Sequence, residues 1–265
     1  MVHERQAAGP REVISVRGLW AGYDGEVVLQ DVNLSVEEGD FVGLIGPNGG
    51  GKTTFLKVLL GLHPPLRGEV RVLGMEVKEG RRYVGYVPQV VEFDREFPIQ
   101  VWDVVRMGRL GRRGLLRRFT REDDEAVAEL LRQVGMWEHR DRLFGELSGG
   151  QRQRVYIARA LAQEPKILLL DEPLASVDSE MRTSIYDLLQ RLNAEQGITI
   201  LMVSHDVGAI SSYVKTVGCL NRRLIYHASK EITAEMLKEG YVCPVDLIAH
   251  GLPHRVFASH REEGR

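Results

Sequence analysis

The sequence predicts an α/β fold: a mostly parallel sheet, an antiparallel β subdomain at the N-terminus and an inserted α-helical subdomain. Three observations support this prediction. Apolar runs of strand length alternate with helical patterns along much of the 265-residue chain, strand patterns stop between Gln89 and Ser148, and several of the 28 glycines gather in the short groups Gly46–Gly51, Gly108–Gly114 and Gly149–Gly150. With 43% apolar and 27% charged residues, the composition is that of a soluble globular protein of one or two domains.

The expected strands are of two kinds. Val13–Trp20 alternates in polarity and leads to a hairpin turn at Tyr23-Asp24-Gly25, so we expect antiparallel pairing up to about Val36. Nearly all-apolar runs indicate strands buried on both faces of a parallel sheet, and these are Phe41–Ile45, Ile167–Leu170 and Ile198–Val203. Further strands are expected at Val84–Val87, Val217–Asn221 and Arg223–His227.

Helical patterns follow the apolar strands and fill the strand-free segment. After the strands, helices are expected at Lys52–Leu60, Gln151–Ala162, Glu180–Ala194 and Asp206–Ser212. The strand-free segment carries Val101–Met107 and Arg121–Val134, the second with an N-terminal cap at Thr120 and Asp123. We expect one main domain over residues 12–228, with a helical insertion at about 90–160. Residues 229–265 are expected to form a helix near Thr233–Lys238 and a tail containing histidines.

Charge and composition exclude several classes of protein. The net charge of −2 gives no general attraction to nucleic acid or anionic lipid. Cys219 and Cys243 are too few and too far apart for a disulfide framework, which fits a reducing cytosol. The polar N-terminal segment does not resemble a signal peptide, and no apolar run approaches the roughly 18 residues that a membrane-spanning helix needs.

A glycine-rich loop carries the strongest functional pattern. Gly46-Pro47-Asn48-Gly49-Gly50-Gly51-Lys52-Thr53-Thr54 matches G-x-x-x-x-G-K-[ST], with a buried strand before it and a helix after it. Glycines let several backbone N–H groups point at one polyphosphate, and the start of the helix adds positive dipole character. Lys52 would reach the β- and γ-phosphates and the Thr53 hydroxyl would hold Mg²⁺. The alternative, a flexible glycine turn with a solvated lysine, does not account for this spacing and context.

A second apolar strand ends in two carboxylates. Ile167–Leu170 is followed by Asp171, Glu172 and Pro173. A carboxylate at the C-terminal end of a parallel strand can coordinate Mg²⁺, and its neighbour can accept a proton from an attacking water. A strand that simply ends in solvated acids is the alternative, and the upstream Lys52 argues against it.

A third pattern is a second helix start that could bind an anion. Leu147-Ser148-Gly149-Gly150-Gln151 places serine and two glycines at the beginning of a helix. One phosphate loop is enough to bind the phosphates of one nucleotide, so a second anion-binding helix start would have to contact the nucleotide in a different geometry. Helix caps of this kind are common, and alone this one would indicate little.

Taken together in this order, these patterns resemble the ATP-binding cassette (ABC) ATPases, which have a P-loop NTPase core, over nearly the whole chain. The resemblance includes Gln89 after Val87-Pro88, the Ser148–Gln151 turn, Asp171-Glu172-Pro173, Asp178 after Ser176-Val177, and His205 after Ser204. It implies an ATPase that uses ATP and Mg²⁺.

The resemblance also implies a role for each matched residue. Two copies would pair head to tail, each ATP lying between the phosphate loop of one copy and Ser148–Gln151 of the other. Tyr23 would stack on adenine, although it also reads as an ordinary turn aromatic. Gln89 would sense Mg²⁺ and the attacking water and link the site to a membrane partner. Asp178 would lie at the dimer seam, and His205 would contact the γ-phosphate. Asp171 and Thr53 would hold the metal, and Glu172 would be the base.

Within this family the chain resembles importers of zinc, manganese or iron. The residues that indicate this are Gly46–Thr54 with Gly50, Val84–Gln89 with Asp94–Pro98, and Val203–Gly208. The resemblance implies separate permease subunits, an extracytoplasmic substrate-binding protein and a peripheral position at the cytoplasmic face of the cell membrane. Importers of iron-siderophore or amino acids share much of this pattern. A soluble cassette ATPase of cluster assembly also fits the length.

Two further segments have alternative interpretations. Cys243, Asp246, His250 and His254 are potential metal ligands, and a helix would align the last three, which recur every four residues. Pro244 and Pro253 interrupt that helix, so we favour a solvated tail. The arginine-rich segment Arg106–Arg118 could contact lipid headgroups or the permease. We favour a solvated loop, because the net charge is near zero and no aromatic residues are interleaved.

Overall fold

The computed structural model of the protein describes residues 11–89, 94, 96–113, 117–175, 177–205, 210, 212–227, 246–248 and 254–256. Within these residues, the central sheet has six strands in the spatial order β10-β9-β3-β8-β7-β6. They are β3 (Phe41–Ile45), β6 (Val84–Val87), β7 (Ile167–Asp171), β8 (Thr199–Ser204), β9 (Thr216–Asn221) and β10 (Arg223–His227). Neighbouring strands are parallel except for β10, which runs antiparallel to β9. The parallel core expected from the sequence is confirmed.

A second, antiparallel sheet has the order β2-β1-β4-β5. Its strands are β1 (Glu12–Tyr23), β2 (Glu26–Glu37), β4 (Arg67–Val72) and β5 (Met75–Glu76). The expected hairpin is present, because Tyr23 pairs with Glu26 across the turn. Strands β4 and β5 were not expected. Most of β4 is exposed and three of its six residues are charged, so an apolar pattern does not mark it.

The helices are α1 (Lys52–Leu59), α2 (Val77–Gly80), α3 (Val101–Met107), α4 (Leu110–Arg113), α5 (Arg121–Gln133), α6 (Gly149–Leu161) and α7 (Ser179–Gln196). Short 3₁₀ turns lie at Arg81–Tyr83, Trp137–His139 and Phe144–Glu146. The cap expected before α5 is confirmed: Thr120 and Asp123 form a reciprocal capping box. The expected helix at Asp206–Ser212 falls mainly, and that at Thr233–Lys238 wholly, outside the described residues.

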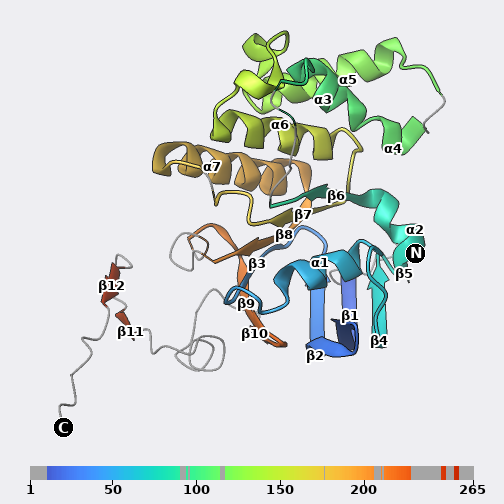
Figure 1. Cartoon of the computed structure of the whole chain (residues 1–265), viewed down its shortest axis with the longest axis vertical. Helices are drawn as coiled ribbons and strands as arrows, with labels where there is room; N and C mark the ends of the chain where they lie inside the picture. The colour runs from blue at the N-terminus through green and yellow to red at the C-terminus, as the bar shows by residue number, and fades with distance from the viewer. Residues whose placement is uncertain are drawn as a thin grey trace, which may run out of the picture.

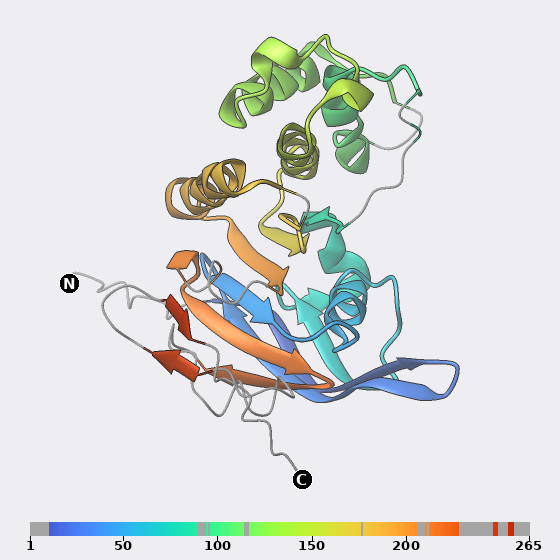
Figure 2. The same ribbon diagram turned by 60° about the vertical axis from the view of Figure 1, so that its left-hand side comes forward.

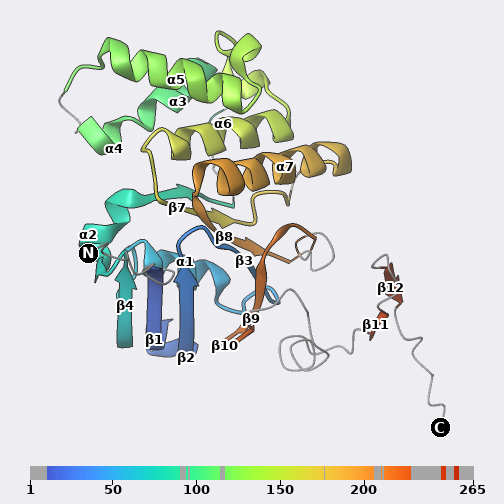
Figure 3. The ribbon, with the colours of Figure 1, turned by 180° about the vertical axis from the view of Figure 1, so that it is seen from behind.

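These elements form layers, which Figure 1 shows one above another. Helices α6 and α7 cover one face of the central sheet, and α3 and α5 lie beyond α6. On the other face, α1 lies between the central sheet and the antiparallel sheet. The view from behind gives the same order (Figure 3), and the turned view separates the helical layer from the sheets (Figure 2).

Alternate residues of the central strands enter two different hydrophobic cores. In β3, Phe41 and Ile45 belong to the core under α6 and α7, whereas Val42 and Leu44 belong to the core around α1. Strands β7 and β8 divide their residues in the same way. Covering both faces requires apolar residues at every position, which explains the unbroken apolar runs in the sequence.

One residue of the arginine-rich segment departs from the solvated loop that we favoured: Arg109 is buried, whereas Arg112, Arg117 and Arg118 are exposed. Arg109 Nε donates to Asp123 Oδ1 at 3.0 Å, and its other donors reach the Ala162 carbonyl at 3.0 Å and Glu164 at 2.8 Å. Asp123 is itself fully buried. Through these contacts Arg109 connects the turn after α3 to helix α5 and to the residues that follow α6. Residues 114–116 lie outside the described part of the chain.

In the described residues of the C-terminal segment, Asp246 and His254 lie in strands and not in the helix that would align metal ligands. Asp246–Ile248 and His254–Val256 are two short antiparallel strands, β11 and β12. Cys243 and His250 lie outside the described residues. Across the part of the chain that the structure describes, no three His, Cys, Asp or Glu side chains gather as a metal site. No helix there is long and apolar enough to cross a bilayer.

The buried Arg109–Asp123 pair gives a prediction about stability. Asp123→Asn should lower the free energy of unfolding by about 3 kcal/mol or more, because it removes the fully buried counter-charge of a buried guanidinium and leaves it paired with the more exposed Glu164. Chemical denaturation measures the change. The matched control is Glu125→Gln, which removes an exposed ion pair with Arg121 on the same helix and should change stability by less than about 1 kcal/mol. Equal effects of the two variants would contradict the prediction.

Candidate functional site

The phosphate loop, Gly46–Thr54, connects the end of β3 to the start of α1. It lies against strand β9: a Cβ atom at Gly46 would stand 2.0 Å from the Leu220 carbonyl oxygen, so only glycine is accommodated there. Helix α1 has buried apolar residues along most of its length, which hold its N-terminus at this edge of the sheet. The first helical residue is Lys52, as the sequence pattern predicts.

The Lys52 side chain folds back over its own loop. Its ammonium donates hydrogen bonds to the carbonyl oxygens of Gly46 and Pro47, both at 2.9 Å. It also lies 3.6 Å from Glu172 Oε1, and both side chains are more than nine-tenths buried. A polyphosphate offers the same kind of oxygen acceptors, so it can take over these contacts when it enters the loop.

Glu172 is the point on which the ends of several strands converge. It follows β7 with a φ of 45°, an uncommon backbone conformation for a residue with a side chain, and its N–H donates to the Val203 carbonyl at 3.0 Å. Its Oε2 accepts hydrogen bonds from Gln89 Nε2 at 2.8 Å and from His205 Nδ1 at 3.1 Å. Lys52, Gln89 and His205, which the sequence analysis selected separately, therefore surround one carboxylate.

Asp171 lies beside this cluster at the end of β7 and is 1% exposed. Burial raises the pKa of its carboxyl, and the charge of Glu172 adds to the rise, whereas the Thr53 hydroxyl and the Lys52 ammonium oppose it. The Tyr86 hydroxyl donates to Asp171 Oδ2 at 3.5 Å, and burial together with the Asp171 charge raises the pKa of Tyr86 to about 12. Tyr86 therefore stays a neutral donor at physiological pH.

The same carboxylate can take a divalent cation. Asp171 Oδ1 is buried and, within the described part of the chain, has no hydrogen-bond partner of ordinary geometry, and the Thr53 hydroxyl is close enough to influence the pKa of the carboxyl. Oxygen donors of these two kinds are the ligands that Mg²⁺ prefers. A cation there would satisfy the lone buried oxygen and remove the cost of its charge.

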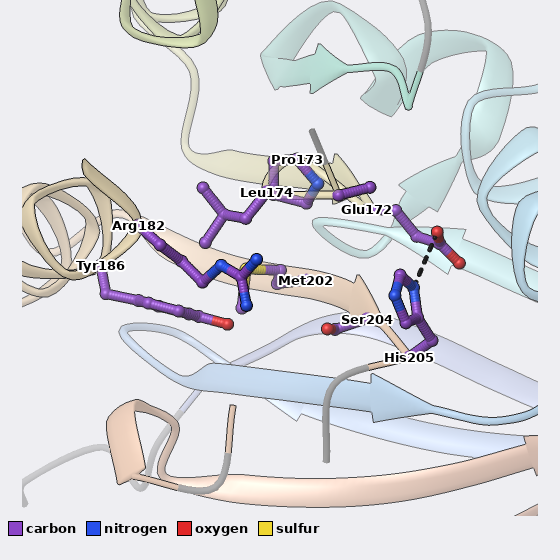
Figure 4. A pocket seen from close by; sticks show the side chains of 9 residues that line it. Glu172, Pro173, Leu174, Arg182, Tyr186, Met202, Ser204 and His205 are labelled. Atoms are coloured by element: carbon purple, nitrogen blue, oxygen red, sulfur yellow. Dashed lines mark hydrogen bonds and ion pairs between the residues drawn. The ribbon is translucent and has the colours of Figure 1, made fainter. Parts of the chain in front are cut away.

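An open cavity of about 840 Å³ lies over these groups. Its walls include Gly46, Pro47, Asn48, Gly49, Gly51, Lys52, Thr53, Thr54, Gln89, Glu172 and His205, together with Val28 and Ala175. A smaller cavity of about 40 Å³ shares Glu172, Ala175 and His205 with the larger one and is drawn in Figure 4. Arg182 and Tyr186 of α7 approach it opposite Ser204 and His205 (Figure 4).

The structure does not bring the second anion cradle into this cavity. Ser148 begins α6, where its hydroxyl accepts from the Gln151 N–H at 3.3 Å and Gln151 Oε1 accepts from the Ser148 N–H at 3.0 Å. Gly150 packs against Met181 of α7, since a Cβ there would lie 2.1 Å from the methionine side chain. Ser148–Gln151 therefore neighbours the start of α7, whose N-terminal cap is Asp178, and none of these residues lines the cavity.

Tyr23 also lies outside the cavity lining. Tyr23 is 40% exposed at the end of β1, and its ring lies against that of His63 at a tilt of 36°. The sequence analysis missed His63, Tyr86 and Arg182. Of these, only Tyr86 carried a signal, because it lies in the strand that leads to Gln89. The other two are placed by contacts between segments far apart in the chain.

Comparison with known proteins gives one consistent result. A family model described as "ABC transporter" matches residues 29–175. The manganese transport system ATP-binding protein MntB of Bacillus subtilis is 41% identical over 230 residues, which cover 86% of this chain and 92% of that protein. The zinc uptake system ATP-binding protein ZurA of Listeria innocua is 40% identical over 221 residues, which cover 82% of this chain and 86% of that protein.

Two solved structures resemble the fold closely. One is described as a metal-chelate type ABC transporter in an inward-facing conformation; it has a TM-score of 0.82 and 28% identity, and the match covers 93% of this chain and 97% of that one. The other is the ATP-binding cassette MJ0796, a dimer in a post-hydrolysis state bound to ADP and Pi. It has a TM-score of 0.68 and 27% identity, with 83% of this chain and all of that one covered.

The buried Asp171 carboxylate leads to a prediction. Because its pKa is raised in the folded chain, the ionised form destabilises the fold at neutral pH, and this loss disappears as the pH falls below the carboxyl's ordinary range. Asp171→Asn should therefore raise the thermal unfolding midpoint of the metal-free chain at neutral pH but not in acid. The exposed Asp141→Asn should raise it at neither pH. A lower midpoint for Asp171→Asn at neutral pH would contradict the prediction.

Proposed function

Because this chain belongs to the ABC transporter family, whose cassettes are ATPases, we propose that it couples ATP hydrolysis to the uptake of a divalent metal cation, zinc or manganese, through a separate membrane permease. The observation that carries the ATP-hydrolysing part of the proposal is the convergence of Lys52, Gln89 and His205 on Glu172 beside the glycine loop. The alternatives are an importer subunit for iron-siderophore or amino acid and a soluble cassette ATPase of cluster assembly.

The loop contacts indicate where the triphosphate binds. Lys52 already bonds to two carbonyl oxygens at the rim of the cavity, and backbone N–H groups of Gly49–Thr54 belong to the loop and the start of α1. We propose that the β- and γ-phosphates bind here, with Lys52 exchanging the carbonyls and Glu172 for phosphate oxygens. His205, at the cavity wall, would then contact the γ-phosphate.

The two oxygens of Glu172 have different partners, which suggests how it acts as the base. Oε2 is held by Gln89 and His205, so the carboxylate cannot rotate freely. Oε1 lies 3.6 Å from the Lys52 ammonium. Once Lys52 turns to the phosphate, Oε1 can accept a hydrogen bond from a water in the cavity. As that water attacks the γ-phosphorus, Oε1 takes its proton and the bond to the leaving ADP oxygen breaks.

Mg²⁺ fits the oxygen donors of the site. We propose that Asp171 and Thr53 hold it, with Gln89 close to it, and that it neutralises charge on the phosphate oxygens when bound. The Tyr86 hydroxyl, kept neutral by its raised pKa, fixes the other Asp171 oxygen.

The separation of Ser148–Gln151 from the cavity supports a head-to-tail pair. A helix start of this kind favours anions, yet none of its residues lines the cavity in its own chain. We propose that it closes over the ATP of a second copy, as expected of cassettes that act as dimers, with Asp178 at the seam. The Gly150–Met181 contact would keep the two surfaces in register.

Mixing two inactive variants tests this composite site. Lys52→Ala and Ser148→Arg should each abolish ATP hydrolysis, and a mixture should restore measurable hydrolysis, because one of the two sites in a mixed dimer contains neither lesion. Phosphate release measures the activity, and circular dichroism verifies that each variant folds.

The control mixture is Lys52→Ala with Glu172→Gln. Both lesions affect the same half of the site, so every site in any dimer is defective and no activity should return. Failure of the first mixture to exceed the control would contradict the head-to-tail arrangement.

The choice of metal import rests on the relatives. MntB and ZurA are named for manganese and zinc transport, and each matches more than four-fifths of this chain. We propose that the chain binds peripherally at the cytoplasmic face of the membrane, next to permease subunits that receive the cation from an extracytoplasmic binding protein. Gln89 donates a hydrogen bond to Glu172 and lies between β6 and α3 in the sequence, and we propose that it links the permease to the catalytic site.

Uptake in cells distinguishes the candidate functions. A strain carrying Glu172→Gln should lose accumulation of labelled zinc or manganese and should still accumulate an iron-siderophore and amino acids. In a second experiment, the tagged wild-type chain should co-purify with an integral membrane protein. Unchanged uptake of both cations, or capture in a soluble complex instead, would contradict metal import. The same strain complemented with the wild-type gene is the control.

A further inference from the structure

The ring of Tyr23 is covered on one side by His63. The centroids of the two rings are 4.3 Å apart and their planes are tilted by 36°. Tyr23 is 40% exposed, and His63 is half-buried. Aromatic pairs at such separations stabilise each other beyond the area that they bury.

His63 is fixed from two directions. Its Nε2–H donates to the Gly22 carbonyl at 2.8 Å, which ties the imidazole to the residue before Tyr23. Its backbone N–H, at 3.2 Å, and that of Leu62, at 2.8 Å, donate to the Lys57 carbonyl in the last turn of α1. The histidine therefore connects the end of β1 to the helix that begins with Lys52.

The Tyr23 hairpin also reaches the phosphate cavity. Tyr23 pairs with Glu26 at the start of β2, and Val28, two residues further along that strand, lines the cavity. A nucleotide whose phosphates occupy the loop can thus place its base near this hairpin.

We propose that His63 is a positioning residue for the purine base: it covers one face of Tyr23, holds the ring in place and leaves the opposite face for the base. This inference rests on the proposed ATP-binding function. Without His63, the exposed tyrosine ring would be free to change rotamer and would lose freedom only when the nucleotide binds. That ordering cost would then weaken binding.

The role predicts which part of the nucleotide is affected. His63→Ala should weaken ATP binding by about two- to tenfold, the range expected for one aromatic contact. The KM for ATP should rise by a similar factor with kcat unchanged, because the base takes no part in bond breaking. His63→Phe, which keeps a ring but lacks the donor to Gly22, should bind ATP within about twofold of the wild type.

The experiment is a calorimetric titration with ATP, followed by competition with inorganic tripolyphosphate, which has no base. Tyr23→Ala is the reference for complete loss of stacking. Leu62→Ala is the matched control, because it lies next to His63 with its side chain 65% exposed. We expect His63→Ala to weaken ATP binding but not the binding of tripolyphosphate. We expect Leu62→Ala to bind both ligands as the wild type does.

Three outcomes would overturn the inference: unchanged or tighter ATP binding by His63→Ala, an equal loss of tripolyphosphate binding, or a His63→Phe affinity as weak as that of His63→Ala. If the wild-type chain binds no ATP at all, the proposed function fails instead, so the two failures can be told apart.

Discussion

The arrangement of the site depends on one buried charge, that of Glu172, at the end of β7. A carboxylate with only 9% of its side chain exposed requires partners, because its contact with solvent is too small to offset the cost of burying its charge. Its partners come from three places: Lys52 from the start of α1, Gln89 from beyond β6 and His205 from beyond β8. Only a sheet in which β6, β7, β8 and β3 are neighbours brings these ends to one edge. The order of the strands therefore determines which side chains surround Glu172.

The same constraint explains the layers around the sheet. Each central strand must be held firmly enough to place a charged group within hydrogen-bond distance of another, and burial on both faces by two separate cores provides this. The positive φ of Glu172 turns its side chain toward the cavity against the preference of its backbone. Asp171 remains ionisable in the same apolar setting at a cost in stability that a bound cation would remove.

Much of the fold and of the candidate site was predictable from the sequence because short local patterns determine it. The glycine loop, the apolar strands and the carboxylates after β7 each occupy a short run of sequence, and the parallel topology follows from strand–helix alternation. Strand β4 was missed because its exposed positions carry charges, so no apolar alternation marks it. Arg109 was misjudged because its partners lie 14 and 55 residues away. His63 was invisible for the same reason: only the folded chain brings the end of α1 beside Tyr23.

The central claim is that Lys52 is shared between Glu172 and the phosphates, so that nucleotide binding frees Oε1 to receive the proton of water. Calorimetric titration of wild-type and Glu172→Gln chains with a non-hydrolysable ATP analogue tests it most directly. The account predicts tighter binding by Glu172→Gln, since the neutral amide no longer competes with phosphate for the lysine. Weaker binding by that variant would contradict the account, because it would mean that Glu172 holds Lys52 in place for the nucleotide instead of competing with it.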